Sequence, residues 1–187
     1  GETGDYFELQ LPPAVNAEST WTLTVIAKSP SGTKTDYTGT IQIYCSDSQA
    51  SLPATYTFTA VDYGIHRFTD VISTKKGTQT ILVGDTTNIA MMGSGTIIVG
   101  AGPLTSFNMT GFPKYTVEGK PIPGTITVTA YDKFSNIKED CLCQIFFSST
   151  DPQASFPSTY TFTQEDGGIH RFSGEQFILK TTGTQIF

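Results

Sequence analysis

Apolar and polar residues alternate along several short segments of this chain. Residues 20–27 place Trp21, Leu23 and Val25 on one side, with threonines between them. An alternation with a period of two is typical of a β-strand with one buried face. Threonine suits the other face, because its β-branched side chain fits the pleat and its hydroxyl can bond to water. The pattern predicts seven strands in the first half of the chain: 6–11, 20–27, 39–45, 55–59, 64–72, 78–84 and 95–99.

Turn-forming residues separate these segments at roughly regular spacing, for example at 29–32, 62–64 and 75–77. Many short strands with such turns predict an all-β Greek-key sandwich. The parity of the alternation then assigns the inward positions. We expect the core to contain Trp21, Leu23, Val25, Ile41, Ile43, Tyr56 and Phe58, and later in the chain Ile126, Val128, Ile145, Phe147, Tyr160 and Phe162.

The chain repeats itself. Residues 46–68 recur as 150–172, and 16 of these 23 positions are identical. The breaker cluster Gly-Ala-Gly-Pro at 100–103 lies between the copies and is typical of a short linker. We therefore predict two domains, residues 5–100 and 101–187, each near the usual domain size.

The second copy stops earlier than the first, because Phe187 aligns with Ile81. We expect it to lack the last strand, which is 95–99 in the first copy. Three interpretations follow. The chain is a fragment of a longer array, it is truncated, or another chain donates the missing strand.

Several motifs resemble the immunoglobulin-like repeats of large microbial surface proteins. They are Leu-Pro-Ala-Thr-Tyr-Thr-Phe-Thr at 52–59, Asp-Tyr-Gly-Ile-His-Arg-Phe at 62–68, Gly-Thr-Gln-Thr-Ile at 77–81 and the Thr/Val strand at 125–132. The strand layout is also similar to that of filamin-type domains. The resemblance implies two tandem seven-stranded immunoglobulin-like β-sandwiches, the second lacking its last strand. It further implies a secreted or surface-anchored array that serves as a stalk, spacer, adhesive surface or fibre component.

The composition of the chain argues against nucleic acids and anionic lipid surfaces as partners. The net charge is −6 and only 15% of the residues are charged. An acidic chain lacks the basic stripe of a nucleic-acid binder or of a protein that docks on anionic lipid. No apolar run approaches the roughly 18 residues of a membrane helix. The 31 threonines and the missing Ala/Leu/Glu/Lys-rich windows argue against a helical bundle. We expect protein partners, namely neighbouring repeats or other subunits of the same assembly, and possible glycan binding.

Candidate chemistry is sparse. His66 and His170 are the only histidines and occupy matching positions, one strand step before Phe68 and Phe172. We predict a structural role for both, as for Trp21, Phe58 and Phe162. No Ser/His/Asp pattern or glycine-rich phosphate loop is present, which predicts no enzymatic activity and no cofactor. Acidic residues recur in turns, such as Asp47 and Asp151 or Asp62 and Asp166, and turn formation is favoured over calcium binding.

Three cysteines, Cys45, Cys141 and Cys143, do not align between the copies and share the parity of inward residues. We expect buried small side chains, since a bond between Cys141 and Cys143 would strain an extended strand. Asn108 begins an Asn-Met-Thr sequon and is a possible glycosylation site in a eukaryotic host.

The sequence therefore favours a non-enzymatic structural or adhesive module of an extracellular or cell-surface repeat protein. The alternatives are a fibre subunit completed by strand donation and a carbohydrate- or protein-binding module, for which Tyr63, Tyr115 and Tyr131 are the exposed aromatic candidates.

Overall fold

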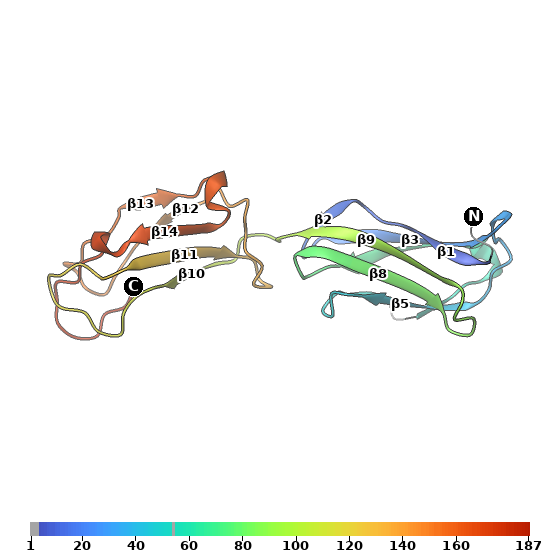
Figure 1. The fold of residues 1–187 in the computed structure, drawn as a ribbon, viewed down its shortest axis with the longest axis horizontal. Helices are drawn as coiled ribbons and strands as arrows, with labels where there is room; N and C mark the ends of the chain where they lie inside the picture. The colour runs from blue at the N-terminus through green and yellow to red at the C-terminus, as the bar shows by residue number, and fades with distance from the viewer. Residues whose placement is uncertain (1–3, 54) are drawn as a thin grey trace. The chain divides into compact units, whose positions relative to one another are not determined.

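The computed structural model describes residues 4–53 and 55–187, and it is built almost entirely from β-strands. The chain divides into two compact units, Gly1–Gly102 (unit 1) and Pro103–Phe187 (unit 2), which Figure 1 shows as separate groups of strands. The expected boundary between the copies lies two residues earlier, inside the same breaker cluster.

Unit 1 is a sandwich of two sheets. In the first sheet β3 is central and pairs antiparallel with three strands. Its members are β1 (Tyr6–Gln10), β3 (Thr20–Ser29), β4 (Gly32–Thr33) and β7 (Ile65–Ile72). The second sheet has the order β2-β9-β8-β5-β6. Its members are β2 (Ala14–Asn16), β5 (Thr40–Cys45), β6 (Thr55–Thr57), β8 (Gly77–Asp85) and β9 (Met92–Gly100).

All seven strands predicted for the first copy are present, as β1, β3, β5, β6, β7, β8 and β9. The sequence did not predict β2 and β4, because each is only two or three residues long and too short to show an alternation. The strand β2 matters for the fold, since it pairs parallel with β9 and extends the second sheet by one strand.

The core of unit 1 follows the predicted parity. Trp21, Leu23 and Val25 on β3 are buried, as are the predicted residues of β5 and Phe58. Tyr56 is only half-buried, although it was expected to face inward. Its ring lies at the edge of the core against Phe58 and Phe68, and its hydroxyl reaches a polar partner.

Unit 2 repeats this arrangement with fewer strands. One sheet has the order β10-β11-β14 and the other pairs β12 with β13. The bounds are β10 (Ser106–Thr110), β11 (Thr125–Tyr131), β12 (Gln144–Phe146), β13 (Thr159–Thr161) and β14 (Ile169–Ser173). The register matches unit 1, because Phe107 lies opposite Ala130 as Phe7 lies opposite Ala27. Within the described chain, the second sheet of unit 2 therefore has two strands where unit 1 has five.

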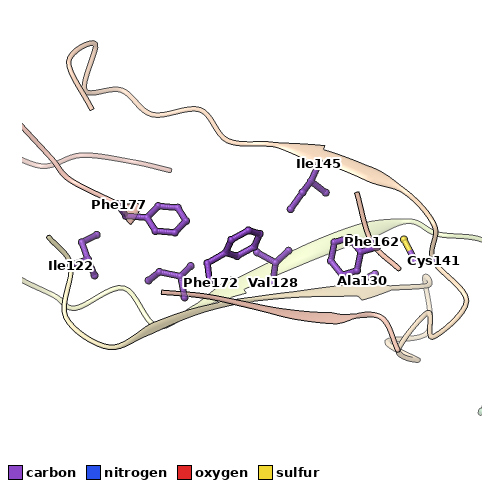
Figure 2. Close-up of a cluster of buried hydrophobic side chains, with 9 residues drawn as sticks. Ile122, Val128, Ala130, Cys141, Ile145, Phe162, Phe172 and Phe177 are labelled. Carbon is purple, nitrogen blue, oxygen red and sulfur yellow. The ribbon is translucent and has the colours of Figure 1, made fainter. Parts of the chain in front are cut away.

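Figure 2 shows the core of unit 2, in which the rings of Phe172 and Phe177 lie between Ile122 at one end and Phe162 at the other. The predicted residues Ile126, Val128, Ile145 and Phe162 are buried, whereas Phe147 and Tyr160 are half-buried and pack against the cluster. Ile122 and Phe177 were not predicted. Both lie outside strands, Ile122 between two prolines and Phe177 directly after the 3-10 helix η3 (Gly174–Gln176), so no alternation marks them.

Candidate functional site

The histidines lie in two equivalent polar clusters, one in each unit. In unit 1 a short 3-10 helix, η1 (Ala60–Asp62), joins β6 to β7 and turns Asp62 back toward both strands. The Oδ1 atom of Asp62 lies 2.9 Å from Nδ1 of His66, and the hydroxyl of Tyr56 donates to the same carboxylate at 3.1 Å. The rings of Tyr56 and His66 stack with their centroids 3.7 Å apart. We call these three residues the Tyr–Asp–His cluster.

Unit 2 builds the same Tyr–Asp–His cluster from Tyr160, Asp166 and His170. The carboxylate of Asp166 lies 2.6 Å from Nδ1 of His170 and accepts the Tyr160 hydroxyl at 2.8 Å. The two rings again stack at 3.7 Å. The helix η2 (Gln164–Asp166) has the same position in the chain as η1, and in both units the residue before the helix is a threonine.

The threonine before each 3-10 helix donates two further hydrogen bonds to the aspartate of its cluster. The backbone N–H of Thr59 donates to Asp62 at 2.7 Å and its hydroxyl donates at 2.9 Å, and Thr163 does the same to Asp166 at 2.7 and 3.1 Å. A histidine oriented by an aspartate is also part of a catalytic triad, but there the imidazole faces a nucleophile. Here tyrosine and threonine both turn their hydroxyls to the carboxylate. The arrangement fixes the corner between two strands, and it holds no activated nucleophile.

Burial and hydrogen bonding act in opposite directions on these carboxylates. Burial alone would raise the pKa of Asp62, but the hydrogen bonds from Thr59, His66 and Tyr56 outweigh it and lower the pKa to about 2. The same balance lowers the pKa of Asp166 to about 2. Both carboxylates are therefore held in the ionised form in the folded state.

A second carboxylate in each unit anchors a distant loop. Asp47 accepts hydrogen bonds from the N–H groups of Thr74 at 2.7 Å and Lys75 at 2.9 Å. Asp151 accepts from Lys180 at 2.6 Å and Thr181 at 3.0 Å. Both aspartates are 3% exposed, so these bonds are shielded from water. The carboxylate oxygens of Asp47 and Asp151 thus accept hydrogen bonds from the backbone of their own unit.

Acid should destabilise both units through these carboxylates. In each unfolded unit an aspartate takes up a proton near its ordinary pKa of 3.8, whereas folded Asp62, Asp166 and Asp151 resist protonation until about pH 2. The unfolded state therefore binds more protons in this window, so we expect stability to fall between about pH 4 and 2. Urea melts at stepwise lower pH test this, and a flat stability down to pH 2 would contradict it.

At one pair of matched positions the two units use different chemistry to hold the same loop region. In unit 1 the Tyr37 hydroxyl donates to the buried carboxylate of Asp85 at 2.5 Å, and a Cβ on Gly39 would clash with both groups. In unit 2 Cys141 and Cys143 replace Tyr37 and Gly39, as the bonds from Phe58 and Phe162 to positions 39 and 143 show. Cys141 is buried, as expected, and Cys143 is half-buried, but the expectation that the two are not bonded to each other was wrong, because the structure joins them in a disulfide. Residues 141–143 lie outside any strand, and their curved backbone brings the two Cα atoms to 5.2 Å.

Reducing the Cys141–Cys143 disulfide should have a small effect. The bond closes a loop of only three residues, so its removal should lower the free energy of unfolding of unit 2 by about 1–2 kcal/mol. Chemical denaturation with and without a phosphine reductant measures the difference. The Cys141→Ser/Cys143→Ser double variant should match the reduced protein, and a full loss of folding on reduction would contradict the expectation.

The other sequence-predicted residues are placed as follows. Trp21 is buried and its indole N–H donates to the Ser73 hydroxyl at 3.1 Å. Asn108 is exposed on β10. Of the aromatic candidates for glycan binding, Tyr63 and Tyr115 are 67% and 81% exposed, whereas Tyr131 is half-buried. Within unit 2, Tyr115 and Tyr131 line different hollows of the surface.

Unit 2 has a cavity of about 500 Å³ between residues 112–118 and 179–187. Phe112 and Phe187 lie on its wall and stack with their ring centroids 4.4 Å apart. Among residues 4–53 and 55–187, no group of three or more His, Cys, Asp or Glu side chains is placed to hold a metal ion. In the same part of the chain, no helix is both long and apolar enough to cross a membrane.

The arrangement of sheets is similar to that of known structures. The structure of FdeC, an Escherichia coli adhesin, shares it with a TM-score of 0.53 at 16% identity, over 91% of this chain and 55% of the adhesin chain. The fold is immunoglobulin-like. This chain spans about half of the adhesin structure. Two weaker likenesses are the surface layer protein SbsC, domains 4–9, and a β-glucuronidase of glycoside hydrolase family 2. Their TM-scores are 0.36 and 0.33, each is 14% identical, and they cover 94% and 90% of this chain and 31% and 17% of the other.

Neither a protein-family model nor a curated protein matches the sequence. What links this chain to other immunoglobulin-like structures is thus the arrangement of its strands. One signal in the sequence does indicate the polar clusters, since the spacing Tyr-x5-Asp-x3-His occurs at 56–66 and again at 160–170.

Proposed function

We propose that this chain is a non-enzymatic structural or adhesive module of a secreted or cell-surface repeat protein, serving as a stalk, spacer or fibre component. The observation that carries the proposal is the repetition of the same internal bracing in both units. The Tyr–Asp–His cluster and the aspartate anchor recur in both units with nearly the same distances. These groups bond to one another and to the backbone of their own unit, which supports a role in holding the fold of each repeat.

The proposal assigns roles to the sequence-predicted residues. His66 and His170 would brace the corner before β7 and β14, and Trp21, Phe58 and Phe162 would fill the cores. The partners would be neighbouring repeats or other subunits of the same assembly. Asn108, exposed on a strand, would accept a glycan only in a eukaryotic host.

Similarity of the fold to an adhesin supports the location and does not name a ligand. The location can be tested directly. Antibodies raised against this chain should label intact source cells, and brief protease treatment of those cells should remove the label. Labelling that appears only after lysis would overturn the proposal.

A further inference from the structure

Each unit carries an arginine at the same position of one sheet. Arg67 lies on β7 and Arg171 on β14, each directly after the histidine of the Tyr–Asp–His cluster, and both are exposed. Among residues 4–53 and 55–187, neither arginine forms an ion pair, a side-chain hydrogen bond or a cation–π contact. Both guanidinium groups are therefore available to a ligand.

In unit 1 the strand register places polar side chains beside Arg67. Arg67 lies opposite Thr24 on β3, and Thr24 lies opposite Gln10 on β1. Side chains at directly opposite positions point to the same face of a sheet, with their Cβ atoms about 5 Å apart. The outer face of this sheet therefore carries a row made of a guanidinium, a hydroxyl and an amide, and a ligand of roughly 10 Å can contact all three.

The row recurs in unit 2 with the same cation. Arg171 lies opposite Thr127 on β11, and Thr127 lies opposite Thr110 on β10. The third member is a hydroxyl in place of the Gln10 amide, and both groups can donate and accept hydrogen bonds. None of the six side chains in the two rows is buried, so the packing of the cores does not explain the recurrence.

In unit 1 the row borders an open hollow of about 510 Å³, a volume within the range of small-molecule sites. Gln10, Thr24 and Arg67 line this hollow, and its other walls include the apolar side chains of Leu11 and Val15. Arg67 is the only charged residue among those that line it. The hollow thus presents one cation, several hydrogen-bonding groups and an apolar wall to the same ligand.

The ligand should carry a negative charge, because the carboxylate of β1 is engaged elsewhere. Glu8 lies two residues before Gln10, and its Oε2 atom is 3.3 Å from Nζ of Lys28. A guanidinium binds a carboxylate through two parallel N–H···O hydrogen bonds, which match it in shape as well as in charge. A carboxylate is therefore the anionic group that suits Arg67 best.

Other anionic macromolecules fit this site poorly. Nucleic acids and anionic membranes are held by many cations at once, whereas the hollow has one cation and the chain has a net charge of −6. An acidic peptide commonly adds to the edge of a sheet through its main chain. The row crosses β3, which is paired on its two sides with β1 and β7, so side chains alone are available here.

We propose that the hollow beside Arg67 binds an acidic sugar, namely a uronic acid residue of a polysaccharide. Arg67 would hold the carboxylate, and Thr24 and Gln10 would exchange hydrogen bonds with the sugar hydroxyls. Leu11 and Val15 would contact the apolar face of the ring. The site rests on the adhesive role proposed above, to which it gives a ligand class. Sugar binding by the purified chain and surface labelling of cells are measured separately, so either can fail alone.

Oligomers of galacturonic acid and of mannuronic acid are the probes, and their methyl esters, which lack the charge, are the matched controls. Calorimetric titration should show saturable binding of at least one of the acids and at least tenfold weaker binding of its ester. The fluorescence of Trp21 should change in the same titration, because Trp21 lines the hollow and is the only tryptophan. Equal binding of acid and ester, no binding of either acid, or binding without a change of the Trp21 signal would overturn the proposal.

Three variants of the chain test the role of Arg67. Arg67→Gln should lower the affinity at least tenfold, and Arg67→Lys, which keeps the charge but not the paired N–H groups, should lower it by a smaller factor. Lys75→Gln is the matched control, because Lys75 is an exposed cation of unit 1 outside the hollow, and it should leave the affinity unchanged. Equal losses in Arg67→Gln and Lys75→Gln would show a general effect of charge and would contradict the site.

Two further ligands separate a uronic acid from other anions. A sulfated oligosaccharide and an oligomer of glutamate should both bind at least tenfold more weakly than the uronic acid oligomer. Equally tight binding of the glutamate oligomer would identify an acidic peptide as the ligand, and equally tight binding of the sulfated sugar would show that the carboxylate is not recognised. Either result would overturn the assignment.

Discussion

Replacing Phe162 by Ala should lower the free energy of unfolding of unit 2 by about 3–5 kcal/mol. Phe162 is 1% exposed and lies next to Phe107, Tyr160 and His170. Its removal leaves a cavity that the sandwich cannot fill without moving the Tyr–Asp–His cluster, whose rings are stacked at a fixed spacing. The effect is large because the variant loses the free energy gained by moving the phenyl ring out of water and also contains an unfilled cavity.

Urea titration followed by circular dichroism measures this change. Phe146→Ala removes the same side chain from an exposed position of the same unit and should change stability by less than about 0.5 kcal/mol. Trp21 is the only tryptophan and is buried in unit 1, so its fluorescence reports that unit separately. A shift of the fluorescence transition by Phe162→Ala would contradict an effect confined to unit 2.

Replacing Asp62 by Ala should destabilise unit 1 by about 2–4 kcal/mol. The substitution leaves Tyr56, His66 and Thr59 without their common acceptor, and the hydrogen bonds to an ionised carboxylate are the strong ones. Because the lowered pKa of Asp62 also makes stability depend on pH, the variant should lose part of the decline between about pH 4 and 2.

Asp70→Ala is the control, since Asp70 is exposed and lies on the same strand as His66, β7. It should leave both the stability and its pH dependence within about 0.5 kcal/mol of the parent. Tryptophan fluorescence at pH 7 and at pH 3 measures both variants. An Asp62→Ala protein that is as stable as the control at pH 7 would show that the cluster does not support the fold.

The strands were predictable from the sequence because their alternation follows directly from the pleat. Leu23, Val25 and Ile41 are fully buried, as their parity required. The alternation shows only which face of a strand a residue occupies, and it does not distinguish a residue in the centre of the core from one at its edge. Tyr56 and Tyr160 were therefore predicted to be buried, although both are half-buried. Their hydroxyls need a partner, and Asp62 and Asp166 supply it from a turn that comes later in the chain.

The clusters and the cavity of unit 2 depend on contacts between distant segments, which periodicity does not encode. The repeated Tyr-x5-Asp-x3-His spacing could have indicated the clusters, since it recurs unchanged. The counterpart of Gly39 is Cys143, a change that becomes understandable only once Tyr37 and Asp85 are seen to fill the space beside that glycine. Ile122 and Phe177 belong to irregular segments and carry no alternation at all.

The replacement of Tyr37 and Gly39 by the Cys141–Cys143 disulfide makes the two units chemically unequal. A reductant acts on unit 2 alone, because the cysteine of unit 1, Cys45, is free. In unit 1 the Tyr37 hydroxyl donates instead to Asp85; burial would raise the pKa of Asp85, but the hydrogen bonds from Tyr37 and the following turn lower it to about 2. Acid thus loosens both units through their aspartates, whereas a reductant loosens unit 2 alone, so two copies of one fold respond differently to the redox state of their surroundings.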